Sequence, residues 1–453
     1  MKNVFLKRLL PICICLCLCL GTVVVLADDA VSGSCGSGVS WSYDASSGEL
    51  VISGNGAITD FENVVMIPWK EYCSDIRSIT VEEGVTGIGD YALSWCENVT
   101  EITLPSTVTR LGRDAFGWCY SLRNITLPEG LRTIENEAFV WCSALTAVDI
   151  PASVNEIGHS AFLSCGALEN INVADANARY SDINGVLCET AGGTLVCYPL
   201  GKTDTSYTVP SGITKIGDWA FYGNSTLTSI EMPSVTDIGS QAFFTCRNLY
   251  EADLSGAVAI GELAFYRCDN MVNVTLPSVQ TVGAEAFRNC TNLQLAAFYN
   301  DSVQIGEGVF EGDDYVSIVG NYGSASNMYA AANGIPFNYF VNVVYNGSPV
   351  EFDPMAFVVN DSTTLVPMRS VFEMLNAAVS WDETTNTAIA QKDGVTVSIQ
   401  IGSSVLLRNG TEVWLPESAR LIADRTYVPL RAVSEAFGNT VEWINETNTA
   451  NIY

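Results

Sequence analysis

The sequence has a single histidine, His159, in 453 residues. A Ser–His–Asp triad, a Cys–His dyad and a multi-histidine metal site would all have to use that one side chain. Because His159 falls in a variable slot of the repeat described below, we interpret it as a surface residue. Glycine-rich phosphate loops are also missing, and no acidic pair lies in a distinctive hydrolase motif. The sequence therefore predicts a protein that is not an enzyme and has no cofactor or metal.

Basic residues are scarce as well. Lys and Arg number 21 against 50 Asp and Glu, and the formal net charge is −29. Such a chain repels phosphate backbones and anionic lipid, which excludes nucleic-acid binding and attachment through a polybasic patch. Only 16% of residues are charged and 48% are hydrophobic, so the chain can bury a large core. Its length predicts two or three domains.

Long apolar runs are missing except at the N-terminus. Lys2, Lys7 and Arg8 precede an apolar stretch over 9–26, and small residues, Val25 and Ala27, mark a cleavage site before Asp28. This pattern predicts a secretory signal peptide over 1–27; an uncleaved anchor is the alternative, because the stretch is long for a signal. No later segment reaches about 18 apolar residues. We therefore expect no transmembrane segment after signal cleavage, and a secreted or bacterial cell-surface location.

Most of the cysteines follow a repeat. Four of the 15 lie in the signal segment, and of the others Cys96, Cys119, Cys142 and Cys165 are spaced by 23 residues, while Cys246, Cys268 and Cys290 are spaced by 22. The surrounding text follows the consensus I-G-x-x-A-F-x-x-C-x-x-L-x-x-I-x-L-P, and a degenerate copy begins at Ile305. A fixed period in this range with Leu and Ile at these offsets predicts a leucine-rich-repeat solenoid over 76–312.

The consensus also predicts the structure of one coil. L-x-x-I-x-L is a short parallel strand with alternate residues inward, and A-F-x-x-C is about one helical turn whose Ala, Phe and Cys face the core. We expect a continuous internal ladder of phenylalanines, Phe116, Phe139, Phe162, Phe221, Phe243, Phe265 and Phe287. The cysteines at the repeat slot are interpreted as small apolar packing residues, and not as metal ligands or a disulfide framework.

Cys188 and Cys197 stand outside this ladder. They flank Ala191-Gly192-Gly193 in a hairpin-like insert over 174–210. A register that pairs Thr190 with Leu195 sets these two cysteines opposite each other, within reach of a disulfide. Cys35 and Cys73 are a second possible pair that spacing alone does not establish.

The repeat with this consensus resembles the BspA-type leucine-rich repeat of bacterial surface antigens. Residues 50–56 with Pro68-Trp69 resemble the N-terminal capping segment of that family, here 28–75, and residues 180–202 resemble its hairpin insert. Residues 318–340 resemble its closing helix and strand, which gives a C-terminal cap over 313–340. The resemblance implies a secreted or wall-associated protein that adheres to host proteins or other cells, and it brings no catalytic residues.

The 22–23-residue period stops after Phe340, and residues 341–453 contain an internal duplication. Residues 366–389 align with 428–452 at an offset of 62, so that Arg369 matches Arg431 and Trp381 matches Trp443. Each half predicts a strand, a short helix opened by Pro, and two further strands, which makes a small α/β domain. The arginines recur in both halves, which indicates a structural role in tying the helix to the adjacent strand.

The pattern V-P-x-R-x-V…V-x-W…N-x-T-x-x-I is similar to the copper amine oxidase N-terminal-like domain of exported Gram-positive proteins. In the enzymes that gave the domain its name, the copper belongs to a separate catalytic domain. Residues 341–453 contain no histidine and no cysteine, which excludes a copper site of the imidazole or thiolate kind. We expect this module to attach the protein to the cell envelope or to space it from there.

Two sets of outward residues are candidate ligand-binding sites. On the strand face the acidic residues are Asp149, Glu231, Glu251 and Asp253, which suit a basic protein or Ca²⁺, although a solvated face without a partner explains them equally well. The slot before the ladder cysteine holds Trp95, Trp118 and Trp141 in three consecutive coils. These rings form either an apolar stripe for a sugar or protein ligand, or a stack that covers the neighbouring turns.

The sequence as a whole predicts an exported, non-catalytic binding or adhesion protein of the cell surface. Its partner would be an extracellular protein or glycan, with a basic partner favoured by the acidic strand face. The alternative is a structural or spacer component of the cell envelope without a specific ligand.

Overall fold

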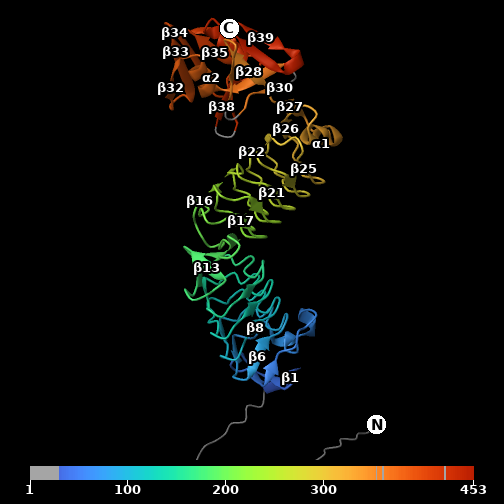
Figure 1. Cartoon of the computed structure of the whole chain (residues 1–453). Coiled ribbons are helices and arrows are strands. Elements are labelled where there is room, and N and C mark those ends of the chain that lie inside the picture. The colour runs from blue at the N-terminus through green and yellow to red at the C-terminus, as the bar shows by residue number, and fades with distance from the viewer. Residues whose placement is uncertain (1–29, 353–354, 360–361, 423–424) are drawn as a thin grey trace, which may run out of the picture.

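The structure, a computed structural model, describes residues 30–352, 355–359, 362–422 and 425–453. The predicted signal segment, 1–27, lies outside the described residues. Figure 1 shows an elongated solenoid that begins at β1 and ends at α1, with the C-terminal domain seated on its far end. The predicted fold class, a repeat solenoid followed by a small sheet-rich domain with two short helices, is confirmed.

The N-terminal end of the solenoid is closed by a small antiparallel sheet. β1 (Ala30–Gly36), β2 (Val39–Asp44) and β3 (Glu49–Gly54) form a meander, and β3 then pairs in parallel with the first strand of the repeats. The connection to that strand includes two 3-10 turns, η1 (Val64–Met66) and η2 (Lys70–Tyr72). Trp69 is fully buried against Trp41, with ring centroids 5.8 Å apart. The cap thus covers the apolar end that the first coil would otherwise expose.

Most coils contribute to two rows of parallel strands, and the coil around Ile125 has no strand in the first row. The first row comes from the L-x-x-I-x-L segments: β5 (Ser78–Val81), β7 (Glu101–Thr103), β10 (Ala147–Ile150), β12 (Asn170–Val173), β16 (Ser206–Thr208), β18 (Ser229–Glu231), β20 (Glu251–Ala252), β22 (Asn273–Leu276), β24 (Leu295–Phe298) and β26 (Ser317–Gly320). The second row ends, in most coils, at the first residue of the I-G pair: β4 (Gly56–Ala57), β6 (Val85–Ile88), β8 (Arg110–Leu111), β9 (Thr133–Ile134), β11 (Glu156–Ile157), β17 (Lys215–Ile216), β19 (Asp237–Ile238), β21 (Ala259–Ile260), β23 (Thr281–Val282) and β25 (Gln304–Ile305). Equivalent residues of successive coils face each other, which keeps the inward residues of all coils aligned.

The A-F-x-x-C segment differs from the helical turn expected. Most coils contain two residues with left-handed backbone here, four positions apart, such as Asp114 (φ 54°) and Trp118 (φ 60°). A left-handed residue ends any right-handed helix. It also turns alternate N–H groups toward the next coil, so that Phe116 donates to Ala138 and Trp118 donates to Val140, both at 2.8 Å. The segment is therefore a run of turns that hydrogen-bonds between coils.

The phenylalanine ladder forms, but in two parts. Phe116, Phe139 and Phe162 stack at centroid distances of 5.2 and 5.4 Å, and a second stack runs from Phe221 through Phe243, Phe265 and Phe287 to Phe310. The hairpin insert separates them and places Tyr198 against Phe221 instead of Phe162. The expected continuous ladder is corrected by this break, because the insert divides the solenoid into two hydrophobic cores.

The ladder cysteines are buried, as packing residues should be. Their thiols donate to the backbone of the preceding coil, for example from Cys142 to the Phe116 carbonyl at 3.2 Å and from Cys246 to the Phe221 carbonyl at 3.1 Å. Two further residues occupy the position of the ladder cysteine and keep the 23-residue period, although the sequence analysis did not include them. Cys73 in the cap precedes Cys96 by one period, and the buried Asp313 follows Cys290 by one period.

The disulfide expected between Cys188 and Cys197 is not present, because the register of the hairpin differs. The insert is built from β13 (Tyr180–Ile183), β14 (Val186–Glu189) and β15 (Thr194–Cys197). A bulge shifts the β14–β15 pairing, so that Cys188 faces Leu195 and Cys197 faces Leu187. The two cysteines therefore point to opposite sides of the sheet, into different hydrophobic cores. Cys188, Cys197, Cys35 and Cys73 are all free thiols.

The C-terminal end of the solenoid is formed by α1 (Ala325–Asn333), which Ser324 caps, and by β27 (Phe337–Tyr339). The domain that follows has three sheets: β28 (Asn342–Tyr345) with β29 (Ser348–Val350), β39 (Val441–Ile444) and β40 (Thr449–Ile452); β30 (Phe357–Val359) with β31 (Thr363–Pro367), β37 (Arg420–Ile422) and β38 (Arg425–Pro429); and β32 (Ala378–Asp382) with β33 (Thr387–Lys392), β34 (Val395–Gln400), β35 (Val405–Arg408) and β36 (Thr411–Trp414).

The predicted duplication relates two halves of this domain. Pro367 opens α2 (Met368–Met374) and Pro429 opens α3 (Leu430–Ala436), while η3 (Asn445–Thr447) follows β39. The strands before the two helices pair antiparallel, with Val366 opposite Val428. The role expected of the arginines is corrected. Arg369 and Arg431 are exposed, and Arg431 approaches Glu435 of its own helix at 4.0 Å and not the adjacent strand.

A separate apolar cluster joins the domain to the solenoid. Leu295 and Ala297 point outward from β24, and they pack with Phe357 and Tyr427 of the C-terminal domain. Phe340 lies between the two bodies, with its ring 4.6 Å from Tyr299 and its backbone bridged to Phe357. The C-terminal domain therefore covers the strand face of the last coils.

Candidate ligand-binding surfaces

The three repeat tryptophans lie along one edge of the turn segments. Trp95 and Trp118 stack with ring centroids 5.2 Å apart and an interplanar angle of 17°, and the Lys70 ammonium lies 5.5 Å from the Trp95 ring centre. Both rings are half-buried. Trp141, in the next coil, is 47% exposed. The row thus combines a stacked pair that covers neighbouring turns with one open aromatic surface at its end.

All three tryptophans have left-handed backbone, with φ between 59° and 62°. Glycine fills the equivalent slot without strain at Gly223 and Gly312. A side chain larger than glycine costs roughly 1 kcal/mol or more in this conformation. Ser164, Thr245, Arg267 and Asn289 fill the same slot with left-handed backbone, so this conformation belongs to the repeat and is not particular to the tryptophans.

The C-terminal half carries a second aromatic row that the sequence analysis missed. Tyr222, Phe244 and Tyr266 follow the core phenylalanines by one position and stack at 5.2 and 4.6 Å. In the N-terminal coils this position holds small or aliphatic residues such as Gly117 and Val140. Aligning the repeats on that column would have revealed the row. The aromatic surface thus moves from one slot to its neighbour across the hairpin insert.

Three of the four acidic candidates lie together on the strand face. Glu231 and Glu251 are exposed on the adjacent strands β18 and β20, and Asp253 continues β20 directly after it. Glu251 and Asp253 are two residues apart and so share a face. Glu231 and Asp253 occupy equivalent positions one strand apart, about 5 Å. Glu231 accepts a hydrogen bond from the Thr208 hydroxyl at 3.0 Å.

Asp149 does not join this acidic group. It lies on β10, in the N-terminal half, where its carboxylate accepts a hydrogen bond from the Asn172 amide at 2.7 Å. The hairpin insert separates it from Glu231 along the solenoid. The tryptophans are also distant from the acidic group in each coil, because they belong to the turn segment and not to the strand face. The candidate residues thus form two surfaces, with Asp149 apart from both.

The acidic group borders the C-terminal domain. A groove of about 300 Å³ is lined by Glu251, Asp253 and Asn273 of the solenoid and by Arg425 of the domain. Arg425 therefore lies beside the most acidic part of the strand face. On the side of the later coils, the C-terminal domain therefore borders the acidic group and leaves less of it open to a partner.

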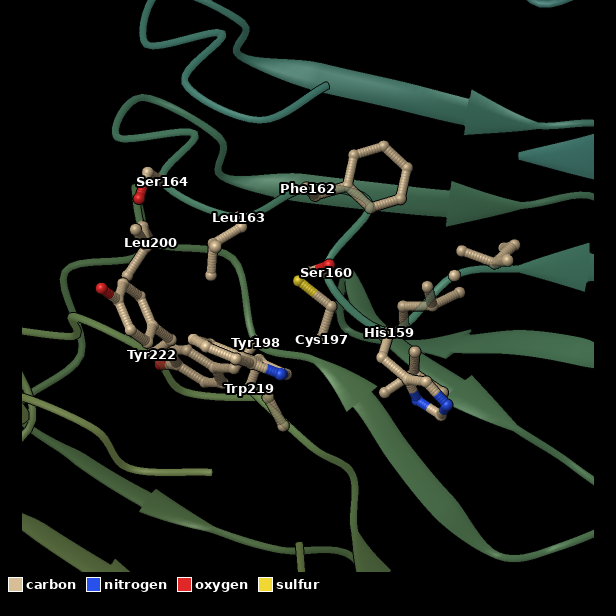
Figure 2. A pocket seen from close by; sticks show the side chains of 15 residues that line it. His159, Ser160, Phe162, Leu163, Ser164, Cys197, Tyr198, Leu200, Trp219 and Tyr222 are labelled. Atoms are coloured by element: carbon tan, nitrogen blue, oxygen red, sulfur yellow. The ribbon is translucent and has the colours of Figure 1, made fainter. Parts of the chain in front are cut away.

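The hairpin insert leaves a hollow between the two cores, with His159 at one end in the view of Figure 2 and Tyr222 at the other. Its volume is only about 20 Å³, room for about one water molecule and not for a ligand. His159 itself is exposed, as expected for a variable slot. Within residues 30–453, apart from the three short gaps, no three or more His, Cys, Asp or Glu side chains cluster as metal ligands, and no helix is long and apolar enough to span a bilayer.

Comparison with known families agrees with this architecture. The model of the BspA-type leucine-rich repeat region matches in six copies over residues 70–182 and 201–317, just over half of the chain. The chain belongs to the BspA-type leucine-rich repeat family. The copper amine oxidase N-terminal domain matches residues 344–452 of this BspA-type protein. Leucine-rich repeat proteins are generally non-catalytic, and the copper amine oxidase N-terminal domain is a non-catalytic domain.

Two solved structures similar to this BspA-type protein are from Eubacterium ventriosum and Faecalibacterium prausnitzii. A leucine-rich repeat protein of Eubacterium ventriosum is 23% identical with a TM-score of 0.52, covering 70% of this chain and 87% of its own. A leucine-rich cell surface protein of Faecalibacterium prausnitzii is 25% identical with a TM-score of 0.50, covering 67% of this chain and 98% of its own. No protein with a curated description matches the sequence. The structural similarities support the solenoid fold.

Proposed function

We propose that this protein is exported to the bacterial cell surface and there binds an extracellular protein or glycan without catalysing a reaction. The predicted signal peptide supports export, and the Faecalibacterium neighbour is described as a cell surface protein. Family membership supports a ligand-binding role for the solenoid. The C-terminal domain, residues 341–453, is proposed to hold the solenoid at the envelope.

The tryptophan row carries the proposal. Trp95 and Trp118 stack with ring centroids 5.2 Å apart, and the row ends in Trp141, which is 47% exposed. Flat, amphipathic rings are the side chains that most often anchor a protein or sugar ligand.

The acidic group favours a partner with positive charge. Glu231, Glu251 and Asp253 concentrate negative charge on one part of the strand face, and this charge would steer a basic partner toward the solenoid. Binding that depends on these residues should weaken as salt increases, because exposed charges are screened within about 10 Å at 0.1 M.

The test is capture of extracellular proteins and glycans by the purified chain and by two sets of variants. Replacing Trp95, Trp118 and Trp141 by Ser should abolish saturable binding, whereas replacing Tyr222, Phe244 and Tyr266 by Ser is the matched aromatic control in the other half. Glu231→Gln, Glu251→Gln and Asp253→Asn together should lower affinity for a basic partner, with Asp149→Asn as the control. Absence of saturable binding by the wild-type protein would favour the structural or spacer role.

A further inference from the structure

The duplicated halves of the C-terminal domain differ in how their shared polar residues are used. In the second half, Arg431 lies 4.0 Å from Glu435, and the Trp443 indole donates to the Asn445 side chain at 2.7 Å. Both groups therefore have partners within their own half. Asn445 corresponds at the 62-residue offset to Glu383 in the first half.

The equivalent groups of the first half have no such partners. Within the described part of the chain, the Arg369 guanidinium makes no ion pair and the Trp381 indole donates no hydrogen bond. Trp381 is 42% exposed, and Arg369 is exposed as well. The first half thus presents a guanidinium, an indole N–H and an aromatic face that the fold itself does not use.

These groups line one groove. It has a volume of about 730 Å³ and lies between α2, which contributes Arg369 and Glu373, and β32, which contributes Ser380 and Trp381. Arg425 of β38 borders the same groove. The volume is within the range of about 300–1,000 Å³ that is usual for small-molecule sites. Two arginines and one carboxylate line it in a protein whose net charge is −29, and one of these arginines, Arg425, also borders the groove beside Glu251 and Asp253.

We propose that this groove binds an anionic glycan, a sugar chain with carboxylate or phosphate groups. Arg369 pairs with the anionic group, since a guanidinium matches both carboxylate and phosphate in a bidentate manner. The Trp381 ring packs on the apolar face of a sugar, and Glu373 and Ser380 exchange hydrogen bonds with its hydroxyl groups. This inference rests on the proposed envelope-attachment role of residues 341–453, for which it supplies a ligand class and a site.

The experiment measures binding of trigalacturonate, glucose 6-phosphate and neutral maltotriose to the purified chain by calorimetry and tryptophan fluorescence. We expect saturable binding of at least one anionic sugar and much weaker binding of maltotriose. R369Q should weaken binding about tenfold or more, as loss of a charge-assisted contact does. W381A should also weaken it about tenfold, because it removes the aromatic surface on which the sugar packs. R369K, which keeps the charge but loses the fork, should bind with intermediate affinity.

The second half provides the matched controls. R431Q and W443A change the same residue types in the duplicate half and should leave binding within about twofold of the wild type, and equal thermal unfolding midpoints show that all variants are folded. The proposal is overturned if neither anionic sugar binds saturably, if maltotriose binds as tightly, or if R431Q weakens binding as much as R369Q. The variant with all three repeat tryptophans changed to Ser should bind the sugars normally, so the outcome is independent of the ligand proposed for the solenoid.

Discussion

The sulfur atoms of Cys73 and Cys96 lie 3.7 Å apart in the buried junction between the N-terminal cap and the first coil. Cys119, one coil further, instead donates to the Leu93 carbonyl at 3.3 Å. The contact between Cys73 and Cys96 lowers the pKa of Cys73 and, together with burial, raises the pKa of Cys96. Cys73 is therefore the thiol of this pair that loses its proton first.

We expect Cys73 and Cys96 to form a disulfide when the protein folds in the presence of a disulfide oxidant such as oxidised glutathione. The Cys73 thiolate would form a mixed disulfide, and Cys96 would displace the reduced glutathione; overall the two thiols lose two electrons and two protons. The positions one coil apart give a Cα spacing near 5 Å, which suits a disulfide. Mass spectrometry of a non-reduced digest should link these two peptides, and C73S should abolish the link. A link between Cys188 and Cys197 instead would contradict the register found in the hairpin.

Truncation of a ladder phenylalanine should destabilise the first core. Phe139 is fully buried and stacks on both sides, against Phe116 and Phe162. Phe139→Ala removes this packing and leaves a cavity, at a cost of about 3–5 kcal/mol. Chemical unfolding followed by circular dichroism measures the change. An unchanged unfolding free energy would show that Phe139 does not pack in the core.

The buried Asp313 should make stability depend on pH. Burial raises its pKa to about 8 from an ordinary value near 3.8, and neither carboxylate oxygen has a hydrogen-bond partner within the described residues. Because the folded pKa lies above the unfolded one, the contribution of Asp313 is fully present below pH 4 and is lost as pH rises toward 8. The slope is about 1.4 kcal/mol per pH unit at most.

Asp313→Asn removes this titration, and the buried Asn224 shows that asparagine is accepted in the same repeat slot. At pH 8 the variant should unfold at a higher temperature than the wild type, and at pH 4.5 the difference should shrink. Scanning calorimetry at both pH values measures it. A difference that does not vary with pH would show that Asp313 titrates normally.

The left-handed slot predicts a stabilising substitution outside the tryptophan row. Thr245 has φ 56°, and a β-branched residue is strained in this conformation. Thr245→Gly should raise the unfolding free energy by about 0.5–1 kcal/mol, the released strain being partly offset by the flexibility of glycine in the unfolded chain. Thr245→Asn, the residue type of the same slot at Asn289, should give a smaller gain. A loss of stability with glycine would contradict the strain at this slot.

Repeat periodicity was sufficient to predict the solenoid, the buried phenylalanines and the outward strand positions, because each coil repeats the same burial pattern. The same period of 23 extends to Cys73 and Asp313, so those slots could also have been found. The left-handed backbone at the slot before the cysteine could not have been predicted from the sequence, because Trp118, Thr245 and Arg267 all adopt it and have no common side-chain property. The hairpin bulge depends on local pairing, which reversed the expected relation of Cys188 to Cys197.

The sequence does indicate where the C-terminal domain packs on the solenoid. The outward positions of β24 hold Leu295 and Ala297, whereas β18 and β20 have Ser229, Glu231 and Glu251 at such positions. Apolar residues on an otherwise polar face indicate a covered surface. The partner that covers them could only be identified from the folded chain, because Phe357 and Tyr427 are distant in sequence.

The stacking of similar coils also determines how far apart the two proposed binding surfaces lie. The tryptophan row belongs to the first coils, and the groove of Arg369 and Trp381 belongs to the domain at the opposite end (Figure 1). Each coil between them adds one strand spacing, about 5 Å, and contacts only its two neighbours. Gain or loss of one coil would therefore change the reach of the molecule in fixed steps while leaving the chemistry at both ends intact.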